Sequence, residues 1–302
     1  KSEFEKIRRE GLYYVDKTMY IPKLEDEPDA LFFIRPRRFG KSLFISMLRA
    51  YYDIKRKDKF DKLFGNLWIG SHPTENQGKY QVLFLDFSKI GGSIDQLEEN
   101  FNAYCNECID SFIETYQEYY PERVVESVLK AKTAARKLNA IGIAAEKKNL
   151  PLYLIVDEYD NFTNVVLNEQ GEEVYTALTH ASGFYREIFK VFKGMFSKIF
   201  MTGVSPVTLD DLTSGFNIGW HISTKPAFNQ MLGFSTEDVR DLFTYYKENG
   251  EIRPDSDVEA IIEEMKPWYD NYCFSKSALK TQSKVFNSDM VFYYLRNYRE
   301  TG

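Results

Sequence analysis

The feature that most constrains this chain is residues 35–42, Arg-Pro-Arg-Arg-Phe-Gly-Lys-Ser, which lie between an apolar run and a helical pattern. The apolar run at 31–34 predicts a short buried strand, and residues 42–52 place apolar side chains at helical spacing. A strand, a loop and a helix in this order aim the helix's N-terminal amides and its positive dipole end at an anion. The segment therefore predicts an α/β fold with an anion site at a strand–helix turn.

The loop matches the phosphate-binding pattern G-x-x-x-x-G-K-[ST] at every position except the first. Gly40 lets the backbone pass close to a phosphate, Lys41 supplies a charge for the β- and γ-phosphates, and Ser42 offers a hydroxyl to Mg²⁺. Arg35 stands where the pattern has its first glycine. We expect Pro36, which restricts the backbone, to supply the turn instead. Because a lone GK[ST] is common, the assignment depends on the rest of the chain.

Three further apolar runs, at 82–85, 152–156 and 198–201, each lead into polar residues. The five consecutive apolar residues at 152–156 indicate a strand covered on both faces, as in a parallel sheet. All four runs then place polar groups at the same edge, where open α/β sheets bind ligands. Residues 228–232 predict a fifth strand.

An acidic pair, Asp157 and Glu158, follows the strand at 152–156. We expect Asp157 to be the Mg²⁺ partner, because Mg²⁺ takes oxygen ligands. Glu158 would orient and deprotonate the water that attacks the γ-phosphate. The alternative is that the pair only makes a strand end soluble. Thr202, which ends the strand at 198–201, either senses the phosphate or bonds its own loop.

The chain resembles the predicted AAA-ATPase-like family of bacteria and archaea, which often carries a C-terminal PD-(D/E)xK nuclease-like domain. Five segments carry the resemblance, at 14–18, 35–42, 157–160, 202–204 and 269–275. In that family Arg-Pro-Arg-Arg-Phe-Gly-Lys-[ST] is the usual loop, so Arg35 does not mark a damaged site. The resemblance implies a P-loop NTPase three-layer sandwich of the additional-strand class, and a smaller helical lid after it. Residues 1–232 would form the core, and residues 233–302 the lid.

Together, the loop pattern and the resemblance imply an ATP and Mg²⁺ site. The expected catalytic residues are Glu158, Lys41 and Arg240, and the expected metal ligands are Ser42 and Asp157. The expected nucleotide contacts are Arg37, Arg38, Phe39, Gly40, Lys41, Ser42, Leu43, Asp16, Lys17 and Thr202.

Three further assignments leave an alternative open. Arg240 begins the predicted lid helix at 238–247, which Ser235 would cap, and it is either a γ-phosphate contact or an exposed helix arginine. Asp16 and Lys17 either lie against the adenine or mark a plain helix start with Asp16 as its N-cap.

Further helices are predicted at 94–120, 172–193 and 257–266, and a helix start at Asn287.

Composition excludes several classes. With 39 basic and 45 acidic residues the net charge is −6, so we expect no direct nucleic-acid binding by this region. Apolar stretches are too short for a membrane span, and three cysteines in 302 residues indicate a reducing compartment, the cytoplasm. Cys105 and Cys108 have C-x-x-C spacing, but the sequence offers no companion ligands for zinc.

The sequence thus predicts a Mg²⁺-dependent, slow ATPase that regulates a partner or an appended nuclease-like domain; a homo-oligomer stays open. The alternative is a scaffold that binds ATP without hydrolysing it, because Arg35 must alter how the loop begins. A nuclease activity of this region itself is disfavoured, since no matching acidic and lysine set stands out on a strand pair.

Overall fold

A computed structural model describes residues 3–161, 184–205, 220–270, 272–281 and 284–301. Its centre is a five-stranded sheet with the order β2-β3-β4-β1-β5, in which every pairing is parallel. The strands are β1 (Ala30–Ile34), β2 (Gln81–Asp86), β3 (Leu152–Asp157), β4 (Lys198–Gly203) and β5 (Trp220–His221). The predicted α/β class with a parallel sheet is confirmed.

The strand register brings the polar strand ends to one edge. Asp86 lies opposite Asp157, and Phe33 of β1 lies opposite Thr202 of β4. In sequence β2 falls between the loop and β3, but in space it is an edge strand. β4 is the strand that separates β1 from β3, so Thr202 lies between the loop strand and the acidic pair.

The predicted fifth strand at 228–232 is wrong. The chain forms a 3₁₀ helix at Pro226–Phe228, and the fifth strand is the short β5. Pro226 lacks a backbone donor for a sheet ladder, and it occupies the first helical turn, where that donor is not needed. Phe228, Met231 and Leu232 are nevertheless buried, in the core beneath α3. Their apolar run reflects packing against other elements rather than strand formation.

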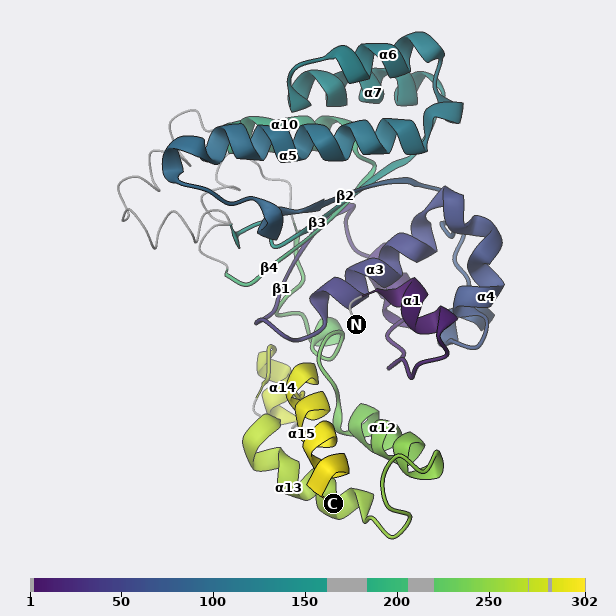
Figure 1. The fold of residues 1–302 in the computed structure, drawn as a ribbon, viewed down its shortest axis with the longest axis vertical. Helices are drawn as coiled ribbons and strands as arrows, with labels where there is room; N and C mark the ends of the chain where they lie inside the picture. The colour runs from purple at the N-terminus through teal and green to yellow at the C-terminus, as the bar shows by residue number, and fades with distance from the viewer. Residues whose placement is uncertain (1–2, 162–183, 206–219, 271, 282–283, 302) are drawn as a thin grey trace.

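Helices cover both faces of the sheet, as Figure 1 shows. One face carries α5 (Ile94–Thr115), α6 (Glu122–Lys130), α7 (Ala134–Lys147) and α10 (Phe184–Met195), and the other carries α1 (Phe4–Arg9), α2 (Tyr20–Glu25), α3 (Lys41–Tyr52) and α4 (Phe60–Phe64). Alternate strand residues divide between the two cores. In β3, Leu154 joins the α5 side and Ile155 the α3 side. This double burial explains why β3 is apolar up to Asp157.

Two predicted helices differ from the structure in their bounds. The helix predicted at 94–120 ends at Thr115, and a 3₁₀ turn at Gln117–Tyr119 follows. Of the helix predicted at 172–193, residues 172–183 lie outside the described residues, and α10 forms the remainder. Shorter 3₁₀ helices lie at Ile54–Lys59, Trp68–Ser71 and Phe87–Lys89.

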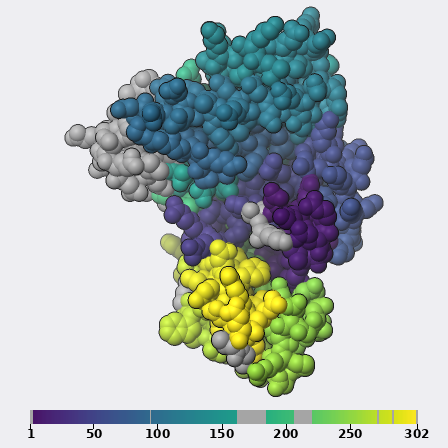
Figure 2. All heavy atoms as spheres, viewed as in Figure 1, coloured from purple at the N-terminus to yellow at the C-terminus, as the bar shows by residue number. Residues whose placement is uncertain are grey.

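The C-terminal helices have a core of their own and lie beyond one end of the sheet (Figure 1), and they form the green and yellow end of the molecule in Figure 2. They are α12 (Thr236–Glu248), α13 (Val258–Tyr269), α14 (Lys276–Lys280) and α15 (Ser288–Thr301). Ser235 and Asp238 form a capping box at α12, which confirms the predicted cap. The domain boundary at 232/233 stays a proposal, although this core begins at Phe234. Within the described residues, no helix combines the length and apolarity that a membrane crossing requires.

Candidate functional site

The loop after β1 enters α3 through a left-handed residue. Gly40 is the N-cap of α3 with φ 89°, and Arg38, two residues earlier, has φ 70°. Glycine adopts such angles without steric cost, whereas Arg38 adopts them only under the constraint of its surroundings. α3 therefore begins at Lys41, with its N-terminal turn and positive dipole end at the loop.

Lys41 closes the loop on itself. Its Nζ donates hydrogen bonds to the carbonyl oxygens of Arg35, at 2.8 Å, and Pro36, at 2.9 Å. Burial lowers the pKa of Lys41, while the negative charges of Asp157 and Glu158 act in the opposite direction. The ammonium group is thus held at the loop, within the field of the acidic pair.

Asp157 is the central hydrogen-bond acceptor of the site, and we call its carboxylate with these bonds the hub. Its Oδ2 accepts a hydrogen bond from Ser42 Oγ at 2.9 Å, and its Oδ1 accepts one from Thr202 Oγ1 at 2.7 Å. The same Oδ1 also accepts the backbone N–H of Glu158 at 2.9 Å. The carboxylate is 4% exposed, so these bonds compensate the cost of burying it. Four residues predicted from three separate segments therefore meet at one point.

The oxygen atoms at this point are chemically suited to Mg²⁺. Ser42 contributes a hydroxyl and Asp157 a carboxylate, 2.9 Å apart, and hard divalent cations prefer such oxygen ligands. The residues present therefore fit the predicted metal site. Their role as ligands stays a prediction.

Glu158 occupies a strained position beside the hub. Its φ is 49°, in the left-handed region that non-glycine residues rarely adopt. Burial, and then the charge of Asp157, raise the pKa of Glu158, while Lys41 and Arg37 act to lower it. A raised pKa brings a carboxylate closer to the range in which it serves as a general base near neutral pH.

The three loop arginines divide into one that faces the protein and two that are exposed. Arg35 is 1% exposed, and its guanidinium donates to the carbonyl oxygens of Ile34, Ser223 and Phe228 at 2.7–2.9 Å. Arg37 and Arg38 are exposed, and the charge of Arg37 acts on both Lys41 and Glu158. The charge of Arg37 thus acts on Glu158, whereas Arg35 is a structural element of the loop.

Two other predicted contacts from the loop and α3 lie mainly in the protein interior. The Phe39 side chain is 1% exposed and contacts the rings of Tyr272 and Phe274. Leu43 is half-buried and packs against the α3-side core. A nucleotide contact by the Phe39 backbone stays a prediction, but its ring is already occupied.

The segment before α2 bonds to neighbouring elements. Asp16 accepts hydrogen bonds from the backbone N–H groups of Thr18, at 2.9 Å, and Trp68, at 2.7 Å. The alternative that Asp16 caps a helix is wrong, because α2 begins at Tyr20 with Met19 as its N-cap. Lys17 Nζ lies 2.8 Å from Asp238 Oδ2, which ties this segment to the start of α12. The adenine-side role of Asp16 and Lys17 stays a prediction.

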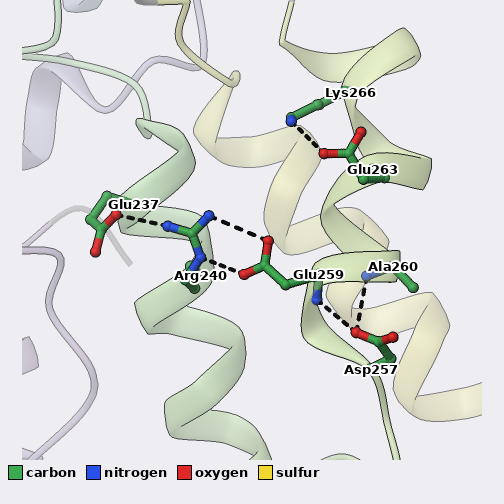
Figure 3. A network of polar contacts seen from close by, with 7 residues as sticks. All are labelled: Glu237, Arg240, Asp257, Glu259, Ala260, Glu263 and Lys266. Atoms are coloured by element: carbon green, nitrogen blue, oxygen red, sulfur yellow. Dashed lines mark hydrogen bonds and ion pairs between the residues drawn. The ribbon is translucent and has the colours of Figure 1, made fainter.

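Arg240 lies among carboxylates of the C-terminal helices (Figure 3). Its Nη1 donates to Glu237 Oε2 at 2.7 Å within α12, and its Nε donates to Glu259 of α13. It is a surface residue whose pKa is raised, first by the hydrogen bond to Glu259. In this arrangement the guanidinium links two helices, and its catalytic role stays a prediction.

The cysteines of the C-x-x-C pair are free thiols on α5. Burial raises the pKa of Cys105 and of Cys108, which disfavours the reactive thiolate. Among the described residues, no group of three or more His, Cys, Asp or Glu side chains is arranged to hold a metal ion.

Sequence reasoning missed the residues that bond the loop carbonyls and the Arg35 side chain. Gly233, Asn287 and Asp289 bond loop carbonyls, and Ser223 and Phe228 accept from Arg35. The signal that pointed toward this region was the segment at 269–275, whose Tyr272 and Phe274 contact Phe39.

Comparison with known proteins adds a family and a few distant likenesses. The model of the family AAA-ATPase_like, described as predicted AAA-ATPase, matches residues 1–213. A curated protein of Azotobacter chroococcum mcd 1, described as an uncharacterized protein in the vnfD 5′ region, is 25% identical over 294 residues. The match covers 91% of this chain and 48% of the relative, so the chain spans about half the length of that relative.

Among solved structures, two forms of the Aeropyrum pernix ORC2 protein are similar to this chain. The ADPNP–ADP complexes give a TM-score of 0.37 and the ADP form 0.38, each at 12% identity. The likeness covers 94% and 93% of this chain and 66% of each ORC2 chain. A likeness at these TM-scores gives no information about the site.

Proposed function

The chain belongs to the predicted AAA-ATPase family, and from this membership and the geometry of the loop we propose that it binds ATP with Mg²⁺ and hydrolyses it slowly. The observation that carries the proposal is the junction at Asp157. One buried carboxylate accepts hydrogen bonds from Ser42 at the start of α3, from Thr202 at the end of β4 and from the backbone of Glu158. A general strand-end acid needs no such set of partners.

Each residue then has a part in phosphoryl transfer to water. The loop amides and Lys41 would hold the β- and γ-phosphates, with Lys41 exchanging its two loop carbonyls for phosphate oxygens. Mg²⁺, when bound by Ser42 and Asp157, would neutralise charge that develops on the phosphate oxygens. Glu158 would orient the attacking water and accept its proton, and its raised pKa suits that role. Arg37, exposed and near Glu158, would add positive charge at the γ-phosphate.

Two measurements test the proposal. Equilibrium titration should show Mg·ATP binding by the wild type and its loss in Lys41→Ala. Phosphate release should then disappear in Glu158→Gln while binding survives. A wild type that binds Mg·ATP no better than Lys41→Ala would contradict the proposal.

A second candidate is a nucleotide-gated scaffold that binds ATP and hydrolyses it negligibly. The position of Arg240 favours it, because its guanidinium is engaged by Glu237 and Glu259 on the surface of the C-terminal helices. Hydrolysis would then wait for an arginine supplied by another subunit or partner. Equal, near-zero phosphate release by wild type and Glu158→Gln, with ATP binding intact, would support the scaffold.

For the biological role we propose control of a partner or of an appended nuclease-like domain, in the cytoplasm. The chain spans about half the length of its curated relative, which leaves room for such a domain in proteins of that size. Direct nucleic-acid binding by this region is not proposed, because its net charge is −6.

A further inference from the structure

Residues just before α12 and at the start of α15 bond three successive carbonyl groups of the phosphate loop, on what we call its outer side. Asn287 Nδ2 donates to the carbonyl of Arg37 at 3.4 Å, the backbone N–H of Asp289 donates to that of Arg38 at 3.4 Å, and the N–H of Gly233 donates to that of Phe39 at 3.1 Å. Phosphate is bound by N–H donors, so bonds to loop carbonyls do not compete with a nucleotide for the same groups. The C-terminal residues can therefore bond the loop carbonyls while a nucleotide binds the loop N–H groups.

Phe39 is the side chain at the centre of this contact. Its ring makes edge contacts with Tyr272, at 4.7 Å between centroids, and with Phe274, at 5.6 Å. Gly233 closes the slot, since a Cβ added there would come within 2.9 Å of the Phe39 ring. Phe274 also faces the guanidinium of Arg35 at 4.0 Å. Two loop side chains are therefore seated against one short segment beyond α13.

The backbone of the loop is strained, so its conformation depends on such contacts. Arg38 and Gly40 both have left-handed backbone angles, 70° and 89°, and Arg38 has no glycine-like freedom to adopt them. Strained backbone persists where surrounding contacts determine it. The carbonyl of Arg38 itself accepts the Asp289 bond at the start of α15. The contact thus acts on the residue whose conformation is least favourable.

We propose that Phe39 is a positioning residue of the nucleotide site, through which the unit α12–α15 holds the loop in its binding conformation. Because a contact that favours the binding conformation raises affinity, nucleotide binding must in turn strengthen the contact by the same factor. The C-terminal unit then reports nucleotide occupancy through the loop backbone, with no need for an arginine that reaches the phosphate. This inference rests on the proposed ATP binding.

Variants on the C-terminal side test it without touching the nucleotide. Phe274→Leu and Tyr272→Leu should each weaken Mg·ATP binding about five- to tenfold, the scale of one lost aromatic contact. Phe243→Leu is the control, because Phe243 is an aromatic residue of the same unit that is buried in the C-terminal core, whereas Tyr272 and Phe274 are half-buried against the core beneath α3. It should change ATP affinity less than twofold. The double variant Phe39→Leu/Phe274→Leu should lose less Mg·ATP binding free energy than the sum of the losses in the two single variants.

A second measurement needs no substitution and covers the case in which a variant does not fold. Hydrogen exchange of the wild type with and without Mg·ATP should slow several-fold at residues 286–291, where the Asp289 amide bonds the loop. Exchange at residues 258–265 of α13, whose buried side chains pack within the C-terminal core, should change less.

The outcomes separate this inference from the proposed function. If wild-type protein does not bind Mg·ATP, both fall together. Two outcomes overturn the inference alone. One is that Phe274→Leu binds Mg·ATP as tightly as Phe243→Leu does. The other is that Mg·ATP adds no protection from exchange at residues 286–291.

Discussion

The two sides of one loop differ in the kind of interaction that holds them. The inner side is polar: Asp157 accepts hydrogen bonds from the hydroxyl groups of Ser42 and Thr202, and the Lys41 ammonium donates to loop carbonyl oxygens. The outer side is aromatic and backbone-mediated, with Phe39 and Arg35 seated against residues near the C-terminus. The difference indicates a division of labour. The inner side supplies chemistry, and the outer side supplies shape and stability.

The strongest test of this division is Glu158→Gln, on the inner side. An amide cannot accept the proton of the attacking water, so phosphate release should fall by about 10²–10⁴-fold while Mg·ATP binding and stability stay near wild type. Single-turnover phosphate release and equilibrium titration measure the two effects. Glu263→Gln, on the surface of α13 where Glu263 pairs with Lys266, is the control and should release phosphate normally. Unchanged release in Glu158→Gln would remove Glu158 from the mechanism.

Arg35→Ala tests the outer side and should affect stability first. The change removes the guanidinium bonds to the carbonyls of Ile34, Ser223 and Phe228 and opens a space between Phe33 and Phe274. Relief of the buried charge offsets part of this loss. We expect a decrease of about 2–4 kcal/mol in the free energy of unfolding, measured by urea denaturation.

Arg35→Lys provides the matched comparison for that variant. It keeps the charge but not the planar fork, so it should recover only part of the stability. A loss below about 0.5 kcal/mol in Arg35→Ala would mean that the outer contacts carry little, and would contradict the division.

The pH dependence of phosphate release should sharpen the picture of the inner side. Burial and Asp157 raise the pKa of Glu158, and the base must be ionised to act. The rate should therefore fall about tenfold per pH unit on the acid side, beginning above the ordinary glutamate value of about 4.3. A rate profile of the wild type should show this limb. A limb at the ordinary value would deny that burial tunes this carboxylate.

The same raised pKa has a consequence for stability with the opposite sense. The native state binds the Glu158 proton more tightly than the unfolded chain does, so this group makes stability fall as pH rises through that range. Glu158→Gln should abolish this slope in unfolding free energy against pH. A slope that persists in Glu158→Gln would assign the effect to other carboxyls.

Thr202→Val should have the smallest effect. It removes the hydrogen bond to Asp157 Oδ1 and keeps the shape of the side chain, which costs about 1 kcal/mol and lowers the phosphate-release rate about three- to tenfold. Thr202→Ser retains the hydroxyl and should stay close to wild type. Equal rates in the two variants would favour the alternative in which Thr202 is only a strand-end residue.

The inner side was predictable because its signals are local. The apolar runs of β1 and β3, the Gly-Lys-Ser sequence and the acidic pair each occupy a few consecutive residues, and parallel strands bring such ends to one edge. The order of the strands was less accessible. Only the resemblance to the additional-strand class places the strand that ends at Thr202 beside the loop strand, and β4 does lie there, between β1 and β3.

The outer side was not predictable from the sequence because its contacts join distant residues. Arg35 bonds Phe228 across 193 positions, and Asn287 bonds Arg37 across 250. The apolar run at 228–232 gave a strand-like signal, although its side chains enter a core built from other elements. Tertiary packing of this kind leaves no period in the local sequence.

The most direct test of the central claim, that the inner side of the loop is an ATP site, is the affinity of the chain for Mg·ATP by titration calorimetry. Wild type should bind, and Lys41→Ala should bind at least about a hundredfold more weakly, because the variant loses the ammonium group that contacts phosphate. Lys55→Ala, which removes a surface ion pair with Glu118 and a contact with the Tyr119 ring, should bind like wild type. Equal affinity of wild type and Lys41→Ala would contradict the claim.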